Sequence, residues 1–344
     1  MNAVYFCNFY NSTLFLPKIN FQKANLPAVR RQIMTFLTVE NLKVQYQTQG
    51  KTIRAVDDVT FSLEDKESIG IAGESACGKS TLGMAIMRAV QGGKIVSGNI
   101  LLESKSILEI SEEQFAKTLR WKEISMIFQG AMNSLDPVFT VKQQFEEILK
   151  THHFNGDYQK TISDILISVG LPLSVLQKSP HELSGGMKQK LVISMALILK
   201  PKFVVADEPT TALDVLVQAQ IVGLLKKLKK NGMSIMLISH DLGVISEIAD
   251  KVGIMYAGKI VEFGSLADIY SDPKHPYTQA LLKSVPKMKG DVNLISLKGE
   301  PPSLSDIPKG CRFYERCPKA MDKCKNDPPK IKTKSGYVLC WLYD

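Results

Sequence analysis

Residues Gly73–Ser80 read GESACGKS and match the pattern G-x-x-x-x-G-K-[ST]. The loop lies between Glu67–Ala72 (ESIGIA), which predicts a buried strand, and Lys79–Val90, which predicts a helix. Glycines let backbone N–H groups wrap around phosphates, and a helix start adds a favourable dipole. Lys79 is expected to reach the β- and γ-phosphates, and the Ser80 hydroxyl to bind Mg²⁺. The candidate nucleotide-binding residues of this stretch are Gly73, Glu74, Ser75, Ala76, Cys77, Gly78, Lys79, Ser80 and Thr81.

Polar residues also follow two later apolar stretches. Phe203–Ala206 (FVVA) predicts a strand that ends in two adjacent carboxylates, Asp207 and Glu208. Asp207 is suited to hold Mg²⁺ through its water shell, and Glu208 to polarise an attacking water. His240 follows the predicted strand Ile235–Ile238 and is a candidate contact of the γ-phosphate. An idle, solvated acidic pair is the alternative, and the phosphate-binding loop in the same chain makes it the weaker one.

The order of elements predicts the fold class. Strand-like and helix-like stretches alternate from Thr35 to about Ala257, and Ala212–Lys230 is a long predicted helix. This order predicts an α/β fold with a mostly parallel sheet covered by helices. Residues 140–200 lack strand signals, so we expect a helical insertion there. Beyond Gly258 the pattern becomes irregular and rich in proline, which predicts a separate tail.

The first 33 residues bear on where the physiological chain starts, and the overall composition bears on whether it spans a membrane or binds nucleic acid. Residues 1–33 show no steady period, so we favour Met34 as the physiological start over a native surface-binding arm. The chain is 44% hydrophobic and 22% charged, and its apolar runs fall short of the ~20 residues that span a membrane. Its net charge of +9 comes without an arginine-rich patch interleaved with aromatics, so we expect a solvated basic surface and no nucleic acid.

The stretch Leu183–Gln189 (LSGGMKQ) separates this chain from other proteins with a phosphate-binding loop. Its Ser-Gly-Gly run at a predicted helix start offers a second anion site with N–H donors and a hydroxyl. Such a site is redundant if one chain binds one nucleotide with its own loop. It has a use if it closes over a nucleotide held by another subunit. A flexible helix cap is the alternative, and it explains only the glycines.

With these motifs in order, residues 35 to about 270 resemble the nucleotide-binding domain of ABC transporters. Gly73–Ser80 is similar to the Walker A loop, and Asp207–Glu208 to the end of Walker B. Gln129 matches the Q-loop, and Ala212–Asp214 the D-loop. The remaining matches are Ser184, Gly185, Gly186 and Gln189 in the signature, His240 as the switch histidine, and Tyr46 as the aromatic that stacks on adenine.

The resemblance implies a P-loop NTPase core with a mostly parallel sheet, an antiparallel β subdomain and a helical insertion at about 130–200. Two such domains would face head to tail, with ATP between one Walker A loop and the partner's signature. The implied catalytic residues are Glu208, His240, Gln129 and Lys79, and the implied Mg²⁺ ligands are Ser80, Gln129 and Asp207. Binding of two ATP molecules would close the dimer, and hydrolysis would reopen it.

A narrower resemblance extends over the tail, residues 271–344. His275–Leu282 (HPYTQALL) and Gly310–Pro318 (GCRFYERCP) are similar to the C-terminal region of the dipeptide, oligopeptide and nickel importers. This implies a peripheral subunit on the cytoplasmic face, partnered by two permease subunits, an extracytoplasmic solute-binding protein and a second ATPase. We favour peptide import and a heterodimer. Nickel or another small solute is the same-class alternative, and a soluble ATPase acting on DNA or ribosomes is a weaker one.

Cysteines suggest two further expectations. The tail carries Cys311, Cys317, Cys324 and Cys340, whose spacing lacks the C-x2-C pairs of common zinc ribbons. Four thiolates suit a [4Fe–4S] cluster or zinc, and the subfamily resemblance favours the cluster over zinc or free thiols. Cys77 lies beside Lys79 at a helix start, which would favour a reactive thiolate; a small residue that merely fits is an equal alternative.

Overall fold

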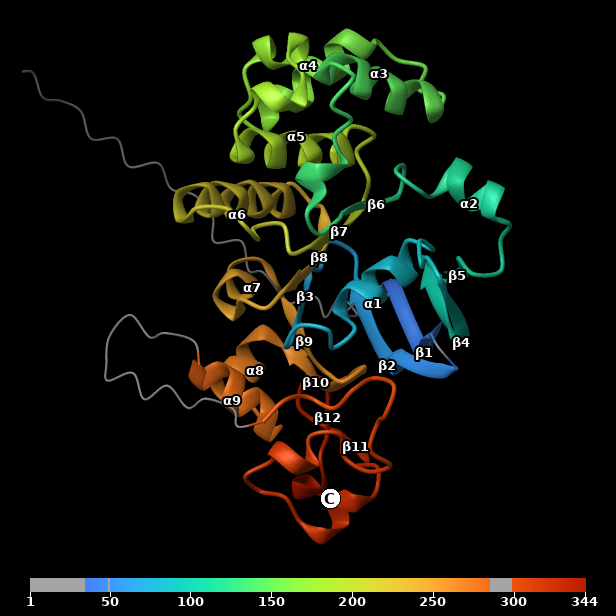
Figure 1. Ribbon diagram of the computed structural model, residues 1–344, viewed down its shortest axis with the longest axis vertical. Coiled ribbons are helices and arrows are strands. Elements are labelled where there is room, and N and C mark those ends of the chain that lie inside the picture. The colour runs from blue at the N-terminus through green and yellow to red at the C-terminus, as the bar shows by residue number, and fades with distance from the viewer. Residues whose placement is uncertain (1–34, 49, 285–298) are drawn as a thin grey trace, which may run out of the picture. The chain divides into compact units, whose positions relative to one another are not determined.

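The computed structural model describes residues 35–48, 50–284 and 299–344 (Figure 1). The expectations about Met34 as the start and about residues 1–33 lie outside the described residues. An eight-stranded sheet carries the fold, in the order β11-β12-β10-β9-β3-β8-β7-β6. Its strands are β3 (Ile69–Ala72), β6 (Ile124–Ile127), β7 (Phe203–Asp207), β8 (Ser234–Ser239), β9 (Lys251–Tyr256), β10 (Lys259–Ser265), β11 (Lys330–Lys332) and β12 (Tyr337–Leu339).

The centre of this sheet is parallel. Strands β6, β7, β8, β3 and β9 pair side by side in the same direction. They are short runs of apolar residues that are buried on both faces, as parallel strands under helices are. Because parallel strands end at one edge, the residues that follow β3, β7 and β8 are brought together there. The α/β fold with a mostly parallel sheet is therefore confirmed.

Nine α-helices are described, and they accompany the sheet and form the insertion. Their bounds are α1 (Lys79–Ile86), α2 (Glu112–Thr118), α3 (Val141–Thr151), α4 (Tyr158–Ser168), α5 (Gly185–Leu197), α6 (Val215–Lys230), α7 (Leu242–Ile248), α8 (Leu266–Ser271) and α9 (Pro276–Ser284). Helices α3, α4 and α5 and short 3₁₀ turns fill the predicted insertion, where no strand occurs between residues 130 and 200. Among the described residues no helix is long and apolar enough to cross a membrane.

Helix α1 is shorter than predicted. It ends at Ile86 rather than near Val90, because Arg88 adopts a left-handed backbone (φ 51°) that stops a helix. Gly83 lets this helix pack closely on the sheet: a Cβ there would lie 2.9 Å from a Val205 methyl. The predicted helix at Ala212 begins only at Val215, since Asp214 forms its N-cap.

A second, antiparallel sheet has the order β2-β1-β4-β5. Its strands are β1 (Thr35–Thr48), β2 (Lys51–Glu64), β4 (Gly93–Leu102) and β5 (Lys105–Ser106). Its inner face packs with α1 and the neighbouring face of the main sheet in one hydrophobic core. The helices of the insertion belong to a second hydrophobic core. The antiparallel subdomain expected from the family resemblance is present.

The irregular tail predicted beyond Gly258 is wrong in part. Strand β10 pairs antiparallel with β9, β12 pairs antiparallel with β10, and β11 pairs antiparallel with β12 at the edge of the sheet. Tyr337 secures the extension, because its ring contacts Phe263 and its hydroxyl donates to the carbonyl of Thr60 at 2.9 Å. The prolines of the tail did not prevent these strands, because none of them lies within β10, β11 or β12. The predicted boundary near residue 270 falls within α8 and stays a prediction.

Candidate functional site

The loop between β3 and α1 has the backbone shape that its two outer glycines permit. Gly73 and Gly78 adopt φ 155° and φ 107°. A Cβ on Gly73 would lie 2.1 Å from the carbonyl oxygen of Met255, and one on Gly78 would lie 2.0 Å from that of Ala55. Neither position accepts a side chain, so the tight loop depends on both glycines.

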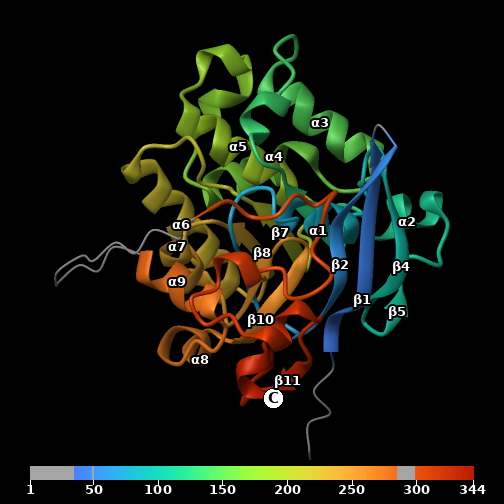
Figure 2. The same cartoon turned by 60° about the horizontal axis from the view of Figure 1, so that its bottom comes forward.

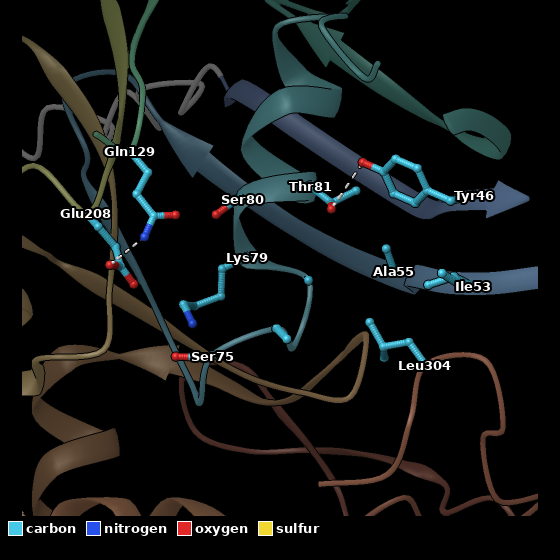
Figure 3. A pocket seen from close by; sticks show the side chains of 12 residues that line it. Tyr46, Ile53, Ala55, Ser75, Lys79, Ser80, Thr81, Gln129, Glu208 and Leu304 are labelled. Carbon is cyan, nitrogen blue, oxygen red and sulfur yellow. Dashed lines mark hydrogen bonds between the residues drawn. The ribbon is translucent and has the colours of Figure 1, made fainter. Parts of the chain in front are cut away.

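Lys79 lies at the floor of this loop. Its Nζ donates to the carbonyl oxygens of Gly73 and Glu74, both at 2.8 Å, and its side chain is buried. Figure 3 shows the ammonium between Ser80 above it and Ser75 below it. The loop carbonyls thus hold a buried positive charge next to the helix start, where anions bind.

Asp207 ends strand β7 close to Ser80. Its side chain is 2% exposed, and its Oδ1 has no hydrogen-bond partner among the described residues. Burial raises the pKa of this carboxyl, while a hydrogen bond from Ser80 acts in the opposite direction. A buried carboxylate oxygen without a partner, beside a hydroxyl, is a donor set that suits Mg²⁺.

Glu208 is the centre of a polar cluster at the same edge of the sheet. Gln129 Nε2 donates to its Oε2 at 3.1 Å, and Thr211 Oγ1 donates to the same oxygen at 2.9 Å. His240 Nδ1 lies 3.3 Å from the other oxygen, Oε1. Glu208 itself adopts a left-handed backbone (φ 46°), a strained conformation of the kind that clusters at functional sites. The structure therefore brings together three predicted residues that follow β6, β7 and β8. It adds Thr211, which was not predicted from the sequence.

The signature residues lie elsewhere. Ser184 caps helix α5, accepting a hydrogen bond from the N–H of Met187 at 3.3 Å. Gln189 is buried and donates to the carbonyl of Pro209 at 2.7 Å, so it supports the turn after Glu208. The signature is thus separate from the pocket above the phosphate-binding loop of its own chain, whose lining residues are Tyr46, Ile53, Ala55, Ser75, Ala76, Gly78, Lys79, Ser80, Thr81, Gln129, Glu208 and Leu304.

That pocket has a volume of about 290 Å³ and an apolar end. Tyr46 is at this end, with its hydroxyl 3.4 Å from Thr81 Oγ1. Its cross-strand neighbour on β2 is Ile53, and side chains directly opposite in an antiparallel pair share a face. Gly93 leaves room for the ring, because a Cβ there would lie 2.7 Å from it. Leu304, far along the chain, was not predicted in this pocket.

The prediction of a reactive thiolate at Cys77 is wrong. The side chain is 3% exposed and lies among the hydrophobic residues beneath the loop. Burial raises the pKa of this thiol, and the nearby charge of Lys79 only partly offsets it. The positive charge of Lys79 is evident from the sequence, whereas the burial of the thiol is a property of the folded chain. Cys77 is therefore a small residue that fits its place.

The cysteines of the tail come near one another without forming a metal site. Burial raises the pKa of Cys311 to about 11, and the thiols of Cys317, Cys324 and Cys340 add to this effect. All four are free thiols. In the described ranges, 35–48, 50–284 and 299–344, no group of three or more His, Cys, Asp or Glu side chains is arranged to hold a metal ion. Thiols are suitable ligands for an iron–sulfur cluster, but the described side chains are not arranged to hold one. The expected iron–sulfur cluster is therefore unsupported.

The fold and the phosphate-binding loop define an ATP-binding cassette. The family model described as ABC transporter matches residues 56–211, and the one described as the oligopeptide/dipeptide transporter C-terminal region matches residues 261–324. A solved dimer of the bacterial ABC transporter cassette MJ0796 superposes with a TM-score of 0.60 at 25% identity, covering 67% of this chain and 98% of that one. The cbiO1 cassette of Clostridium perfringens gives a TM-score of 0.59 at 25% identity, covering 69% and 91%.

Curated relatives are more similar and extend over the tail. The oligopeptide transport ATP-binding protein AppD of Bacillus subtilis is 44% identical over 90% of this chain and 97% of its own. The dipeptide transport ATP-binding protein DppD of the same organism is 43% identical over 90% and 95%. The oligopeptide transport ATP-binding protein OppD of Escherichia coli is 39% identical over 90% and 93%. The chain belongs to the oligopeptide and dipeptide ABC transporter ATP-binding family.

Proposed function

We propose that this chain binds and hydrolyses ATP to power the import of dipeptides or oligopeptides. The observation that carries the proposal is the Glu208 cluster, built from three strand ends beside a phosphate-binding loop. The relatives named for oligopeptide and dipeptide transport, and the match of residues 261–324 to the C-terminal region of such transporters, support peptides as the cargo.

In this proposal the loop and the strand ends share the work on the phosphates. Lys79 and the N–H groups of the loop bind the β- and γ-phosphates of ATP. Ser80, Asp207 and Gln129 would hold Mg²⁺, and the Oδ1 of Asp207, which has no partner among the described residues, supports this assignment. When bound, the cation neutralises charge that develops on the phosphates. Tyr46 stacks on the adenine at the apolar end.

Glu208 is the proposed general base. Its carboxylate orients and polarises the attacking water, and Gln129 and Thr211 fix one of its oxygens. His240 borders the other oxygen and is exposed, so we assign it a contact with the γ-phosphate. Catalysis then rests on positioning and electrostatics, as in other phosphoryl transfers.

The signature at Ser184–Gly186 serves the other subunit of a dimer. It lies outside the nucleotide pocket of its own chain, although a helix start with a serine suits a phosphate. Val215 and Leu216 follow Asp214 and are exposed, and apolar residues there fit a subunit contact. We propose a heterodimer with a related ATPase. Native mass spectrometry of the purified transporter distinguishes one copy of each chain from two copies of this one.

The helical insertion is the proposed contact with the two permease subunits at the cytoplasmic face of the membrane. Val138 and Phe139, which follow the Gln129 loop, are both exposed at the entrance to the insertion. Exposed apolar side chains of this kind mark interaction surfaces. Movement of Gln129 during the ATP cycle would then reach the permeases through this segment. An extracytoplasmic solute-binding protein would deliver the peptide.

Reconstitution with the neighbouring permease subunits and solute-binding protein tests this function. We expect ATP hydrolysis to rise several-fold with peptide-loaded binding protein, and Lys79→Ala to abolish it by loss of nucleotide binding. Stimulation by nickel without any response to peptides would overturn peptide import. Co-purification with ribosomes or nucleic acid in place of permeases would overturn a transport role altogether.

The tail cysteines have a separate test. Protein purified without oxygen is analysed for iron, sulfide and zinc. Stoichiometric iron and sulfide would show that Cys311, Cys317, Cys324 and Cys340 rearrange around a cluster, against the arrangement found here. Absence of all three elements is the result expected from the arrangement of the described side chains.

A further inference from the structure

We infer that the tail, residues 271–344, is a C-terminal extension that completes the nucleotide site. In it Leu304 forms a wall against the base of the nucleoside triphosphate. This inference rests on the proposed ATP site and adds a residue from outside the ATP-binding cassette. Leu304 lines the pocket that also contains the phosphate-binding loop, although the two are more than 200 residues apart in sequence. In Figure 3 it lies across the apolar end from Tyr46, with Ile53 and Ala55 beside it.

The surroundings of Leu304 suit a planar, mostly apolar group. Tyr46, Ile53 and Ala55 come from the β1–β2 hairpin and lie on one face of it. The phosphate end, in contrast, is lined by polar residues such as Lys79 and Ser80. A nucleotide with its phosphates on the loop must direct its base toward the apolar end, where Leu304 is half-buried and accessible from the pocket.

The backbone around Leu304 is fixed to the cassette. The N–H of Arg54 on β2 donates to the carbonyl of Leu304 at 3.0 Å. A neighbouring hollow, whose walls include Ala76 and Cys77 of the loop, is lined on its other side by Pro301–Ser305. Figure 2, with the extension turned forward, shows this red segment reaching strand β2. Leu304 is therefore held beside the loop by a main-chain hydrogen bond to β2.

Other side chains of the extension secure the same contact. Arg316 donates to both carboxylate oxygens of Glu74, at 2.8 and 2.9 Å, within the phosphate-binding loop. The hydroxyl of Tyr277 accepts from the N–H of Glu74 at 2.9 Å. Arg312 bonds to Asp57 on β2 and to the carbonyl of Ala257. These contacts join the extension to the loop and to β2, so it is positioned as part of the nucleotide site.

The test compares a ligand that has a base with one that lacks it. Calorimetric titrations of the full chain with Mg²⁺ use the β,γ-imido analogue of ATP and inorganic tripolyphosphate. We expect Leu304→Ala to weaken binding of the analogue about fivefold to tenfold, because it removes apolar contact area. Binding of tripolyphosphate should stay within twofold of the original chain.

Two further variants keep the result unambiguous. Leu304→Met conserves volume and should restore analogue binding to within about twofold. Leu342→Ala, a half-buried leucine of the same extension outside the pocket, should change neither affinity. Equal weakening of both ligands by Leu304→Ala, or no weakening of either, would overturn the inference. If the unaltered chain binds neither ligand, the proposed ATP site itself fails.

Discussion

Replacing Glu74 tests how strongly the extension is coupled to the phosphate-binding loop. Glu74 and Arg316 form a bidentate ion pair in which the arginine side chain is 7% exposed and the glutamate 25%. This pairing raises the pKa of Arg316, so the guanidinium stays charged. Glu74→Ala removes the opposing charge from a buried cation, which costs about 3 kcal/mol of unfolding free energy. Arg316→Ala leaves a carboxylate that water can reach, and we expect about 2 kcal/mol.

A double-mutant cycle measures the coupling. Urea unfolding followed by circular dichroism should show the double variant about 2 kcal/mol more stable than the two single losses predict together. The pair Lys325–Asp322 is the control, because its side chains are 64% and 96% exposed and its coupling should be below about 0.5 kcal/mol. Additive losses for Glu74 and Arg316 would refute the view that this ion pair holds the extension to the loop.

Three other predictions concern single side chains. Thr211→Val should lower kcat about fivefold with little change in KM for ATP, because one hydrogen bond to Glu208, worth about 1 kcal/mol, is lost. An unchanged kcat would exclude a role of Thr211 in positioning Glu208. Cys77 should resist maleimide in the native protein and react only after unfolding, as peptide mass spectrometry can show; rapid native labelling would contradict its burial. Burial lowers the pKa of His275 to about 3, so between about pH 6.5 and 3 the unfolded chain binds a proton that the native chain does not. The free energy of unfolding therefore falls by about 1.4 kcal/mol for each pH unit of acidification in this range. Between pH 6.5 and 5 the unfolding free energy of His275→Asn should fall by about 2 kcal/mol less than that of the original chain, and an equal fall in both proteins would refute this.

The parts of the site that could be predicted from sequence are those that local pattern encodes. The phosphate-binding loop needs two glycines at fixed spacing, and the acidic pair follows an apolar strand, so residue order alone located them. The alternation of strands and helices predicted a mostly parallel sheet, and in the structure the parallel strands bring Gln129, Glu208 and His240 to one edge. The phosphate-binding loop and the acidic pair could be predicted because each depends on neighbours within a few residues.

The parts that escaped depend on contacts between distant segments. Leu304 and Arg316 reach the loop only because the extension folds back beside β2, and no periodicity reports that. Thr211 was overlooked because a threonine in a turn has many uses. The prediction for Cys77 failed for a related reason: the charge of Lys79 is visible in the sequence, whereas the burial that raises the pKa of the thiol is a tertiary property.

Hydrolysis by the Glu208→Gln variant tests the central claim most directly. The amide keeps the size of the side chain but cannot accept a proton from water, so we expect ATP turnover to fall at least about a hundredfold. Nucleotide binding should persist and hold the dimer closed in size-exclusion chromatography. Glu247→Gln, an exposed carboxylate paired with Lys226 on the surface, is the matched control and should keep full turnover. Full activity of Glu208→Gln would contradict the account.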